Sequence, residues 1–445
     1  MKISVRGFKS IKSVKDFRIE PINILAGINS SGKSSLTQSL LLLKQTLESD
    51  SKEMIKLNGP YVYAENLQDL LYGKNKTNDL EYSLWIDGND MVGNETLARF
   101  LQDENIDHIE LALKFIGNGT VHLKEMGFTL CGEKGTCKSM DMKRNQRQDV
   151  YQVSTNDARM LGLAKNTVLT LKSCHIEFSN FLPMFGESKA KNTPETMFAF
   201  PVIKAFRDIL SDVFSQIYYI GPIRVKPALA MAFDNMPQTE YIEPDGSNTR
   251  YILFEKRNMK LQDGTTLYES VNRWICRQLN LAEQIDTTKE TNQLYRTKLK
   301  NKEGLNIDLC HMGFGISQIL PIIVQGLLMP PGGILIVEDP CVHMHPSVQA
   351  AMVDFMLDLA EHNQCRFVVE THSDHIVTRL RRRVAEGKIW AEKINLTFVS
   401  MKADGSCYQK IGLTGQGAFS TRLPEGFLDT QDNDFRAIIE TRRNR

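Results

Sequence analysis

The chain has 445 residues, of which 42% are hydrophobic and 24% charged, a composition that supplies a sizeable core and excludes a disordered or low-complexity protein. Its 54 Lys and Arg nearly balance its 53 Asp and Glu, so any nucleic-acid binding would need a local basic patch. Eight cysteines over this length do not indicate a disulfide framework, and residues 1–17 hold no apolar segment of signal-peptide length. We therefore expect a cytoplasmic protein of two or three domains.

Strand and helix patterns alternate at the N-terminus, with strands expected at 2–5, 22–26 and 80–86 and a Leu-rich helix at 34–47. Residues 87–200 are mixed and polar, with clusters of turn residues. Signals return as a buried strand at 218–221, an amphipathic helix at 269–279 and strong alternation after residue 310. This pattern favours an α/β fold with a parallel or mixed sheet flanked by helices, formed by 1–86 and 216–445. Residues 87–215 are then an inserted α+β lobe of unknown role.

Residues 319–337 carry no charge over a length that would cross a bilayer. Two prolines and two glycines at 330–333 interrupt this stretch, and they would break a helix and leave backbone groups unpaired in lipid. The better interpretation is a buried helix, a tight turn and a short buried strand at 334–337. We therefore expect no membrane association.

The strongest motif spans residues 27–34, which match the complete pattern G-x4-G-K-S. An apolar strand precedes it and an apolar-periodic helix follows, so that successive N–H groups and the helix N-terminus can surround a phosphate. Lys33 would neutralise the β- and γ-phosphate oxygens, and the Ser34 hydroxyl would bind Mg²⁺. We predict a nucleotide site formed by Gly27, Asn29, Ser30, Ser31, Gly32, Lys33, Ser34 and Ser35.

A second element of this site follows the buried strand at 334–337, which ends in Glu338 and Asp339. Open α/β sheets bind their ligands at the carboxyl ends of such strands. One carboxylate would bind Mg²⁺ and the other would orient or activate the attacking water. The alternative interpretation is a pair of acids in a surface loop.

These motifs resemble the head of ABC-type ATPases of the RecF, SMC and overcoming-lysogenization-defect group. RGFKSIK at 6–12, GINSSGKSS at 27–35, IGPIR at 220–224, MGFGISQILPII at 312–323, EDPCVHMHPSVQ at 338–349 and ETHSDHIVTRLRRR at 370–383 follow the order of that group. LPEGFLDTQDNDF at 423–435 is similar to the C-terminal end of single-head ATPases from bacterial anti-phage systems of the Septu kind. The resemblance covers about residues 1–85 and 216–445, and says little about the segment between them.

The resemblance implies a P-loop head that uses ATP and Mg²⁺. Glu338 takes the place of the magnesium-binding Walker B acid, Asp339 that of the catalytic glutamate, and His372 that of the histidine that senses the γ-phosphate. A neutral imidazole can donate to a phosphate oxygen or to water, which agrees with that role. The alternative for His372 is a histidine that follows the buried strand at 366–369 and has its hydrogen bonds satisfied there, with no catalytic role. The segment from 312 aligns with the signature that a second head presents to the nucleotide, through Gly313, Gly315 and Gln318.

Three residues depart from the pattern of the group. Gly313 replaces the signature serine, Asp339 is one methylene shorter than glutamate, and Cys341 replaces a frequent acid. Each departure argues against fast turnover, and none argues against nucleotide binding. We expect a slow switch rather than a motor.

Three other clusters leave alternatives open. Cys341, His343, His345, His372 and His375 invite a transition-metal interpretation, although the H-x-H segment also matches the resemblance. Cys131, Cys137, Cys174 and His175 could hold zinc, but their spacing fits no common zinc pattern and isolated cysteines are usually small buried residues. Arg379, Arg382 and Arg383 share one helix face, which is either a solvated surface or a site for nucleic-acid phosphates or an acidic partner.

The resulting hypothesis is a Mg²⁺-dependent, slowly hydrolysing switch ATPase that dimerises through its heads and controls a partner effector in anti-phage defence. Because no nuclease constellation is evident, a nuclease partner would be a separate protein. The alternatives are a RecF-like ATPase of DNA repair and an ATP-bound scaffold with little turnover.

Overall fold

The computed structural model describes residues 1–51, 53–75, 78–88, 106–118, 120–132, 135, 137–145, 150–157, 160, 168–184, 200–226, 228–232, 240–291, 294–312, 314–424, 426–427 and 430–443. The chain divides into two compact units. Residues 1–19, 34–217 and 401–407 form one, which we call the lobe unit. Residues 20–33, 218–400 and 408–445 form the other, which we call the P-loop unit. The sequence placed residues 1–19 and 34–86 with the head, whereas here they group with the lobe.

The lobe unit is built on an eight-stranded sheet in the order β2-β1-β4-β5-β6-β7-β8-β9, and every pairing in it is antiparallel. Side chains alternate between a buried and an open face along β4, as expected for a sheet covered on one side. The bounds are β1 (Lys2–Phe8), β2 (Ile11–Arg18), β4 (Leu80–Asp87), β5 (Ile106–Asn118), β6 (Thr120–Gly132), β7 (Cys137–Asn145), β8 (Val150–Thr155), β9 (Leu169–Cys174), β10 (Glu177–Ser179), β11 (Leu182–Met184), α1 (Lys33–Leu47), α2 (Leu67–Leu70) and α5 (Phe200–Ser215).

A row of small residues crosses the open face of this sheet. Ser4 pairs with Ser83, Ser83 with Ala112, and Ala112 with Gly127 on successive strands. The row forms the floor of a hollow of about 430 Å³, whose rim carries side chains of both charges. Because these charges are mixed, the hollow has no evident preference for an anion or a cation.

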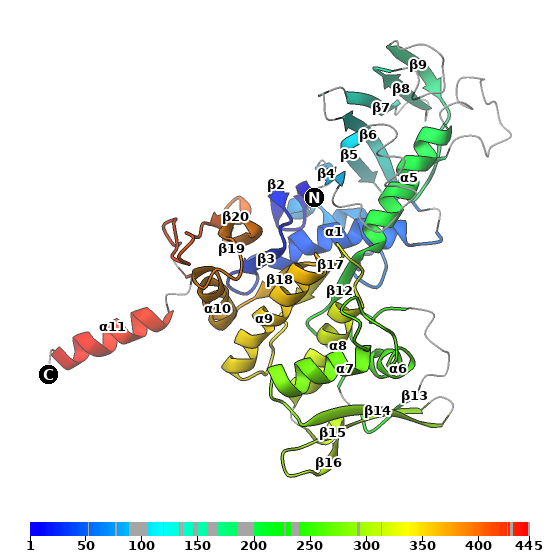
Figure 1. The fold of residues 1–445 in the computed structure, drawn as a ribbon. Coiled ribbons are helices and arrows are strands. Elements are labelled where there is room, and N and C mark those ends of the chain that lie inside the picture. Colours follow the sequence, from blue (N-terminus) through cyan, green and yellow to red (C-terminus); the bar gives the residue numbers. More distant parts are fainter. Residues whose placement is uncertain are drawn as a thin grey trace. The chain divides into compact units, whose positions relative to one another are not determined.

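The P-loop unit is built on a six-stranded sheet in the order β12-β17-β18-β3-β19-β20 (Figure 1). β17, β18, β3 and β19 are parallel, and the two-residue connection from β19 to β20 makes that last pair an antiparallel hairpin. The expected α/β class with a mixed sheet is therefore confirmed. The bounds are β3 (Ile22–Ala26), β12 (Ile217–Ile220), β17 (Ile334–Glu338), β18 (Arg366–Thr371), β19 (Ile394–Lys402), β20 (Gly405–Ile411), α6 (Thr249–Glu255), α7 (Leu267–Asn272), α8 (Phe314–Leu328), α9 (Pro346–His362), α10 (Asp374–Ala385) and α11 (Thr430–Arg443).

The central strands of this sheet are buried because both of their faces are covered. All five residues of β3 and of β17 are buried, and all of them are apolar except Asn23 in β3 and Glu338 at the end of β17. α9 packs on β18 and β3, and α8 and α10 both contact α9. A four-stranded sheet made of β13 (Met231–Ala232), β14 (Gln284–Thr291), β15 (Leu294–Lys300) and β16 (Asn306–Asp308) adds to this unit.

The apolar stretch 319–337 resolves into most of α8, a turn and β17, as the prolines and glycines at 330–333 predict. Pro321 lies within α8 without ending it. Among the described residues, no helix is both long and apolar enough to cross a bilayer.

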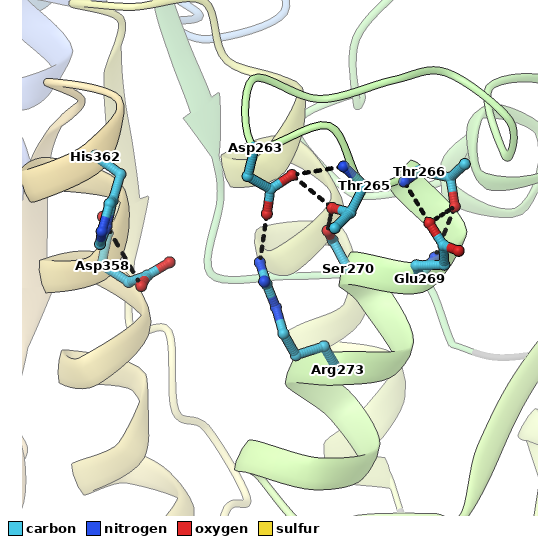
Figure 2. Close-up of polar contacts among 8 residues, drawn as sticks. All are labelled: Asp263, Thr265, Thr266, Glu269, Ser270, Arg273, Asp358 and His362. Carbon is cyan, nitrogen blue, oxygen red and sulfur yellow. Dashed lines mark hydrogen bonds and ion pairs between the residues drawn. The ribbon is translucent and has the colours of Figure 1, made fainter.

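The amphipathic helix expected at 269–279 is α7 followed by one π-helical segment, Arg273–Gln278. Figure 2 shows how α7 begins: Thr266 accepts from the Glu269 backbone at 3.2 Å, and the Glu269 carboxylate accepts from the Thr266 backbone at 2.7 Å. Asp263 accepts from Arg273 at 3.1 Å, which ties the preceding turn to the helix.

Candidate functional site

The site is built where three neighbouring parallel strands end. β3 runs into the glycine-rich loop, β17 ends at Glu338, and β18 ends at Thr371 just before His372. Glu338 is in register with Glu370, and Thr371 with Ala26. Because these strands are parallel and in register, the residues at and after their carboxyl ends lie together at one edge of the sheet. These residues are Lys33, Glu338, Asp339 and His372.

The glycine-rich loop has the unusual backbone that its sequence requires. Gly27, Ser30 and Gly32 have φ values of 156°, 60° and 97°. A Cβ at Gly27 would lie 2.2 Å from the carbonyl oxygen of Val399, so no side chain fits there. Tyr408 donates from its hydroxyl to the carbonyl of Gly32 at 2.6 Å and fixes the end of the loop.

Lys33 lies inside this loop, where its Nζ donates to the carbonyls of Gly27 and Ile28, both at 2.9 Å. Burial lowers the pKa of Lys33, while the carboxylates of Asp339, Glu370 and Glu338 oppose that shift in decreasing order. Asp339 therefore acts on the ammonium more strongly than either of the other acids.

Glu338 is buried at the end of β17, and its Oε1 accepts a hydrogen bond from the Tyr219 hydroxyl at 2.7 Å. Burial, with a contribution from the charge of Glu338, raises the pKa of Tyr219, so that this hydroxyl stays protonated and donates. The bond fixes the orientation of this carboxylate at the end of the strand.

Asp339 follows with a left-handed backbone, φ 41°, which is uncommon for a residue with a side chain. Its N–H donates to the carbonyl of Glu370 at 2.9 Å. The Arg224 guanidinium donates to the carbonyl of Glu338 at 2.7 Å and to that of Asp339 at 3.4 Å. The turn after β17 is thus bound from two sides.

His372 lies at the surface of the unit and forms a hydrogen bond with the backbone of Gly27. Desolvation and then the nearby Lys33 ammonium lower the pKa of His372, with Asp339 opposing them. The lowered pKa favours the neutral ring at pH 7, and a neutral imidazole still has one N–H that can donate. Ser373 begins α10 by accepting from the Ile376 N–H, and it donates to Gln349 at 2.6 Å.

The other predicted loop residues differ in their surroundings. Asn29 and Ser30 are exposed, whereas Ser31 is buried. Ser34 follows Lys33 in the first turn of α1. The Ser35 hydroxyl is bonded to the hydroxyl of Ser10 at 2.8 Å, so within the lobe unit it has a structural partner.

The three predicted signature residues are not equally placed to face a second head. Gly313 lies outside the described residues. Gly315 stands in the first turn of α8, and a Cβ there would lie 2.4 Å from the Met344 Sδ. Gln318 is buried, and its Nε2 finds no hydrogen-bond partner among the described residues. As the unit stands, Gln318 is therefore not part of its outer surface.

The basic cluster on α10 is largely neutralised within the chain. Asp354 on α9 accepts from Arg379 at 3.0 Å and from Arg383 at 2.6 and 2.8 Å. Glu386 accepts from Arg382 at 2.7 Å and also pairs with Arg383. These arginines hold α10 against α9 and against the segment that follows it, so they do not form an unpaired phosphate-binding patch.

The histidine and cysteine clusters have structural partners as well. His345 begins α9, where its Nδ1 accepts from the Ser347 N–H at 3.2 Å. Cys131 and Cys137 are joined by a disulfide across the β6–β7 hairpin, where they are directly paired. The expectation of isolated cysteines is wrong for this pair, because the hairpin register places the two opposite each other. Among the described residues no three His, Cys, Asp or Glu side chains gather as a metal site.

The site fits ATP and Mg²⁺ by its chemistry. The loop carries a buried ammonium, that of Lys33, and leads from a parallel strand directly into the N-terminus of α1, an arrangement that suits a phosphate chain. The Glu338 carboxylate supplies hard oxygen donors of the kind Mg²⁺ takes together with phosphate oxygens. Bound Mg²⁺ would neutralise charge on the phosphates; Lys33 would hold them and His372 would donate to them.

Sequence reasoning missed the residues that support the site. Arg224 is the last residue of the IGPIR segment and Tyr219 directly precedes that segment, which carried a resemblance but no assigned role. Glu370 begins the segment 370–383 but had no assigned role, and Tyr408 lies in no motif; the partners of both are far away in the sequence. Only the sheet order brings them together.

Comparisons with known proteins agree with this site in coarse terms. Residues 239–377 match the family described as the AAA ATPase domain, a segment that contains β17 and His372 but not the glycine-rich loop. The match supports an ATP-binding ATPase. No curated protein matches the sequence.

The chain also has a distant likeness to solved SMC heads. One is an SMC head bound to the C-winged helix domain of ScpA (11% identity, TM-score 0.44, 93% of this chain and 97% of that chain). A second is the SMC head domain from Thermotoga maritima (12% identity, TM-score 0.40, 93% of this chain and 98% of that chain). The third, derived from Pyrococcus furiosus, is an Smc head domain with an extended coiled coil bound to the C-terminal domain of ScpA (10% identity, TM-score 0.44, 99% of this chain and 98% of that chain).

Proposed function

We propose that this protein is a Mg²⁺-dependent ATPase that binds ATP at the glycine-rich loop and hydrolyses it slowly. The observation that carries the proposal is the convergence of Lys33, Glu338, Asp339 and His372 at one edge of the P-loop unit. Lys33 and the loop N–H groups hold the phosphates, Glu338 holds the metal, and His372 senses the γ-phosphate. Asp339 orients the attacking water.

Slow turnover follows from the acid next to the metal-binding residue. A well-placed general base contributes about 10²–10⁴-fold in rate. Asp339 is shorter than the glutamate that the resemblance implies, so we expect its share to lie at the lower end of that range.

The test is ATP hydrolysis by the full chain with and without Mg²⁺, beside the variants Glu338→Gln and Asp339→Asn. We expect slow, Mg²⁺-dependent release of phosphate that Glu338→Gln abolishes and Asp339→Asn reduces less. Turnover that survives Glu338→Gln but not Asp339→Asn would reverse these two roles. Binding without measurable turnover would favour a scaffold.

We further propose that ATP closes two heads into a dimer, each head presenting the start of α8 to the nucleotide of the other. A helix N-terminus offers positive potential to an anion, and two such contacts close a symmetric pair. ATP stabilises the closed form only by binding it more tightly than the open form.

Gly315 provides the test of this closure. Any side chain at Gly315 meets the Met344 Sδ, so Gly315→Ala is the matched control for Gly315→Asp. In sedimentation, the wild type and Gly315→Ala should be dimers with ATP and monomers without it. Gly315→Asp should bind ATP and remain a monomer in both cases. An association state indifferent to nucleotide and to both variants would remove the switch from the proposal.

The role in anti-phage defence, with a separate effector or nuclease as partner, rests on the sequence resemblance. A neighbouring gene for a nuclease-like or toxic protein, and loss of phage protection with Lys33→Ala, would support it. Salt-dependent DNA binding without such a neighbour would favour the RecF-like alternative.

A further inference from the structure

Arg224 is a buried cation whose partners are main-chain atoms. It is 4% exposed and follows β12 by four residues. Its guanidinium reaches the carbonyls of Glu338 and Asp339, and its Nε has no hydrogen-bond partner among the described residues. The nearest contacts of this charge are therefore the backbone of the turn that carries both acids of the site.

Stability alone does not account for a charge in this place. Burying an ion is unfavourable unless it is well paired, and apolar residues of similar volume often stabilise a protein as much or more. Burial lowers the pKa of Arg224 to about 10, although Cys341, Asp339, Tyr219 and Glu338 all oppose that shift. Two carbonyls and no bidentate carboxylate are a weak set of partners for so desolvated a group.

The backbone that Arg224 holds is itself strained. A left-handed residue with a side chain costs on the order of 1–3 kcal/mol and persists only where its surroundings fix it. The N–H of Asp339 is fixed by Glu370 on β18, and the two carbonyls around it are fixed by Arg224. The charge of the Asp339 carboxylate acts on both Lys33 and His372, so this residue lies near the glycine-rich loop.

We propose that Arg224 is a positioning residue, which holds the left-handed turn at Asp339 so that its carboxylate meets the attacking water. Arg224 touches neither the nucleotide nor the reacting atoms, and acts through Asp339. The inference rests on the proposed ATPase function and deepens it by assigning a role to the IGPIR segment.

The test compares Arg224→Met and Arg224→Lys with a matched control. Arg250 is the control because it is also a buried arginine that donates to a backbone carbonyl, that of Ala228 at 2.8 Å, and burial lowers its pKa too. The measurements are kcat and KM for Mg²⁺-ATP, the Kd for ATP without Mg²⁺, and the melting temperature of each full-length variant.

A misplacement of about 1 Å at a reacting group can cost about 10²-fold in rate. Because the share of Asp339 is itself modest, we expect Arg224→Met to lower kcat about tenfold, with the ATP Kd changed by less than about threefold. Arg224→Lys retains the charge on a single donor nitrogen in place of the guanidinium fork, so its kcat should lie between Arg224→Met and the wild type. Arg250→Met should lower the melting temperature while kcat stays near that of the wild type.

The decisive measurement is the double variant Arg224→Met with Asp339→Asn. If Arg224 acts through Asp339, the double variant should hydrolyse ATP no more slowly than the worse of the two single variants. Additive losses, an unchanged kcat in Arg224→Met, or equal losses in Arg250→Met would overturn the positioning role while the ATPase itself stands. A wild type that never hydrolyses ATP overturns the proposed function, and this inference with it.

Discussion

Replacing Lys33 by alanine separates a role in binding phosphate from a role in folding. Its Nζ now donates to two carbonyls of its own loop, and with ATP it would donate to phosphate oxygens instead. A hydrogen bond to a charged group contributes about 1.5–3 kcal/mol, which corresponds to a loss of about 10- to 150-fold in affinity for each bond removed. Two such bonds would bring ATP binding close to the limit of detection.

The effect on folding should be small by comparison. Burial already lowers the pKa of Lys33, so removal of the ammonium relieves a desolvation penalty. Gly27 and Ile28 are not buried, so that water can reach the carbonyls that are left. We expect a change of about 1 kcal/mol or less in the free energy of unfolding, which is about 2–4 °C in melting temperature.

Lys44 is the matched control, because it is a second buried lysine on α1. It donates to Glu48 and, at 3.1 Å, to the carbonyl of Phe214. Lys44→Ala should destabilise the chain by about 1–3 kcal/mol and leave affinity for a fluorescent ATP analogue unchanged. Unchanged affinity in Lys33→Ala, or equal loss in both variants, would refute the phosphate-site assignment.

Two further predictions concern protonation and the disulfide. Because desolvation and Lys33 lower the pKa of His372, acid below about pH 6.5 protonates this group first in the unfolded chain. The contribution of His372 to the free energy of unfolding is therefore complete above that pH and decreases as the pH falls below it. In a series of melting curves from neutral to acid pH, His372→Ala should lose less stability than the wild type. The Cys131–Cys137 bridge closes a short loop, so Cys137→Ser should lower stability by about 2 kcal/mol, seen in denaturant unfolding. ATP affinity should not change in that variant, because the bridge lies in the lobe unit; a loss of affinity would contradict this division of the chain.

The elements at the centre of the site were predictable from local pattern. β3 and β17 are mostly apolar because both faces of a parallel sheet are covered. The glycine-rich loop follows β3 directly, and β17 ends in Glu338, with Asp339 next to it. The glycine-rich loop was predictable because its residue types are dictated by backbone conformation, as the close approach of Gly27 to Val399 shows. In each case the structure is determined by residues that are adjacent in the sequence, so a motif can reveal it.

The lobe unit was not predictable in the same way. One face of its eight-stranded sheet is open, so about half of the residues in each strand are polar and the strands do not stand out as apolar segments. In β2 only three of eight residues are buried. The sheet also takes up β1 and β2, which the sequence assigned to the head. The α10 arginines illustrate a related limit: a basic run says nothing of Asp354, which is distant in sequence and pairs with Arg379 and Arg383.

The charges around Lys33 predict how strongly ATP binding depends on Mg²⁺. One ammonium faces three carboxyl groups, those of Asp339, Glu370 and Glu338, so a triphosphate without a metal would enter a site that already carries negative charge. Two charges about 6 Å apart at an effective dielectric constant of about 20 interact by about 3 kcal/mol, up to about a hundredfold in affinity. Glu338→Gln should therefore raise affinity for Mg²⁺-free ATP and remove most of the gain that Mg²⁺ gives. Glu370→Gln, the matched control, removes a similar charge from a residue that is not assigned to the metal, so it should raise the Mg²⁺-free affinity and keep that gain. An equal Mg²⁺ effect in the wild type and in Glu338→Gln would mean that the metal is held by other groups.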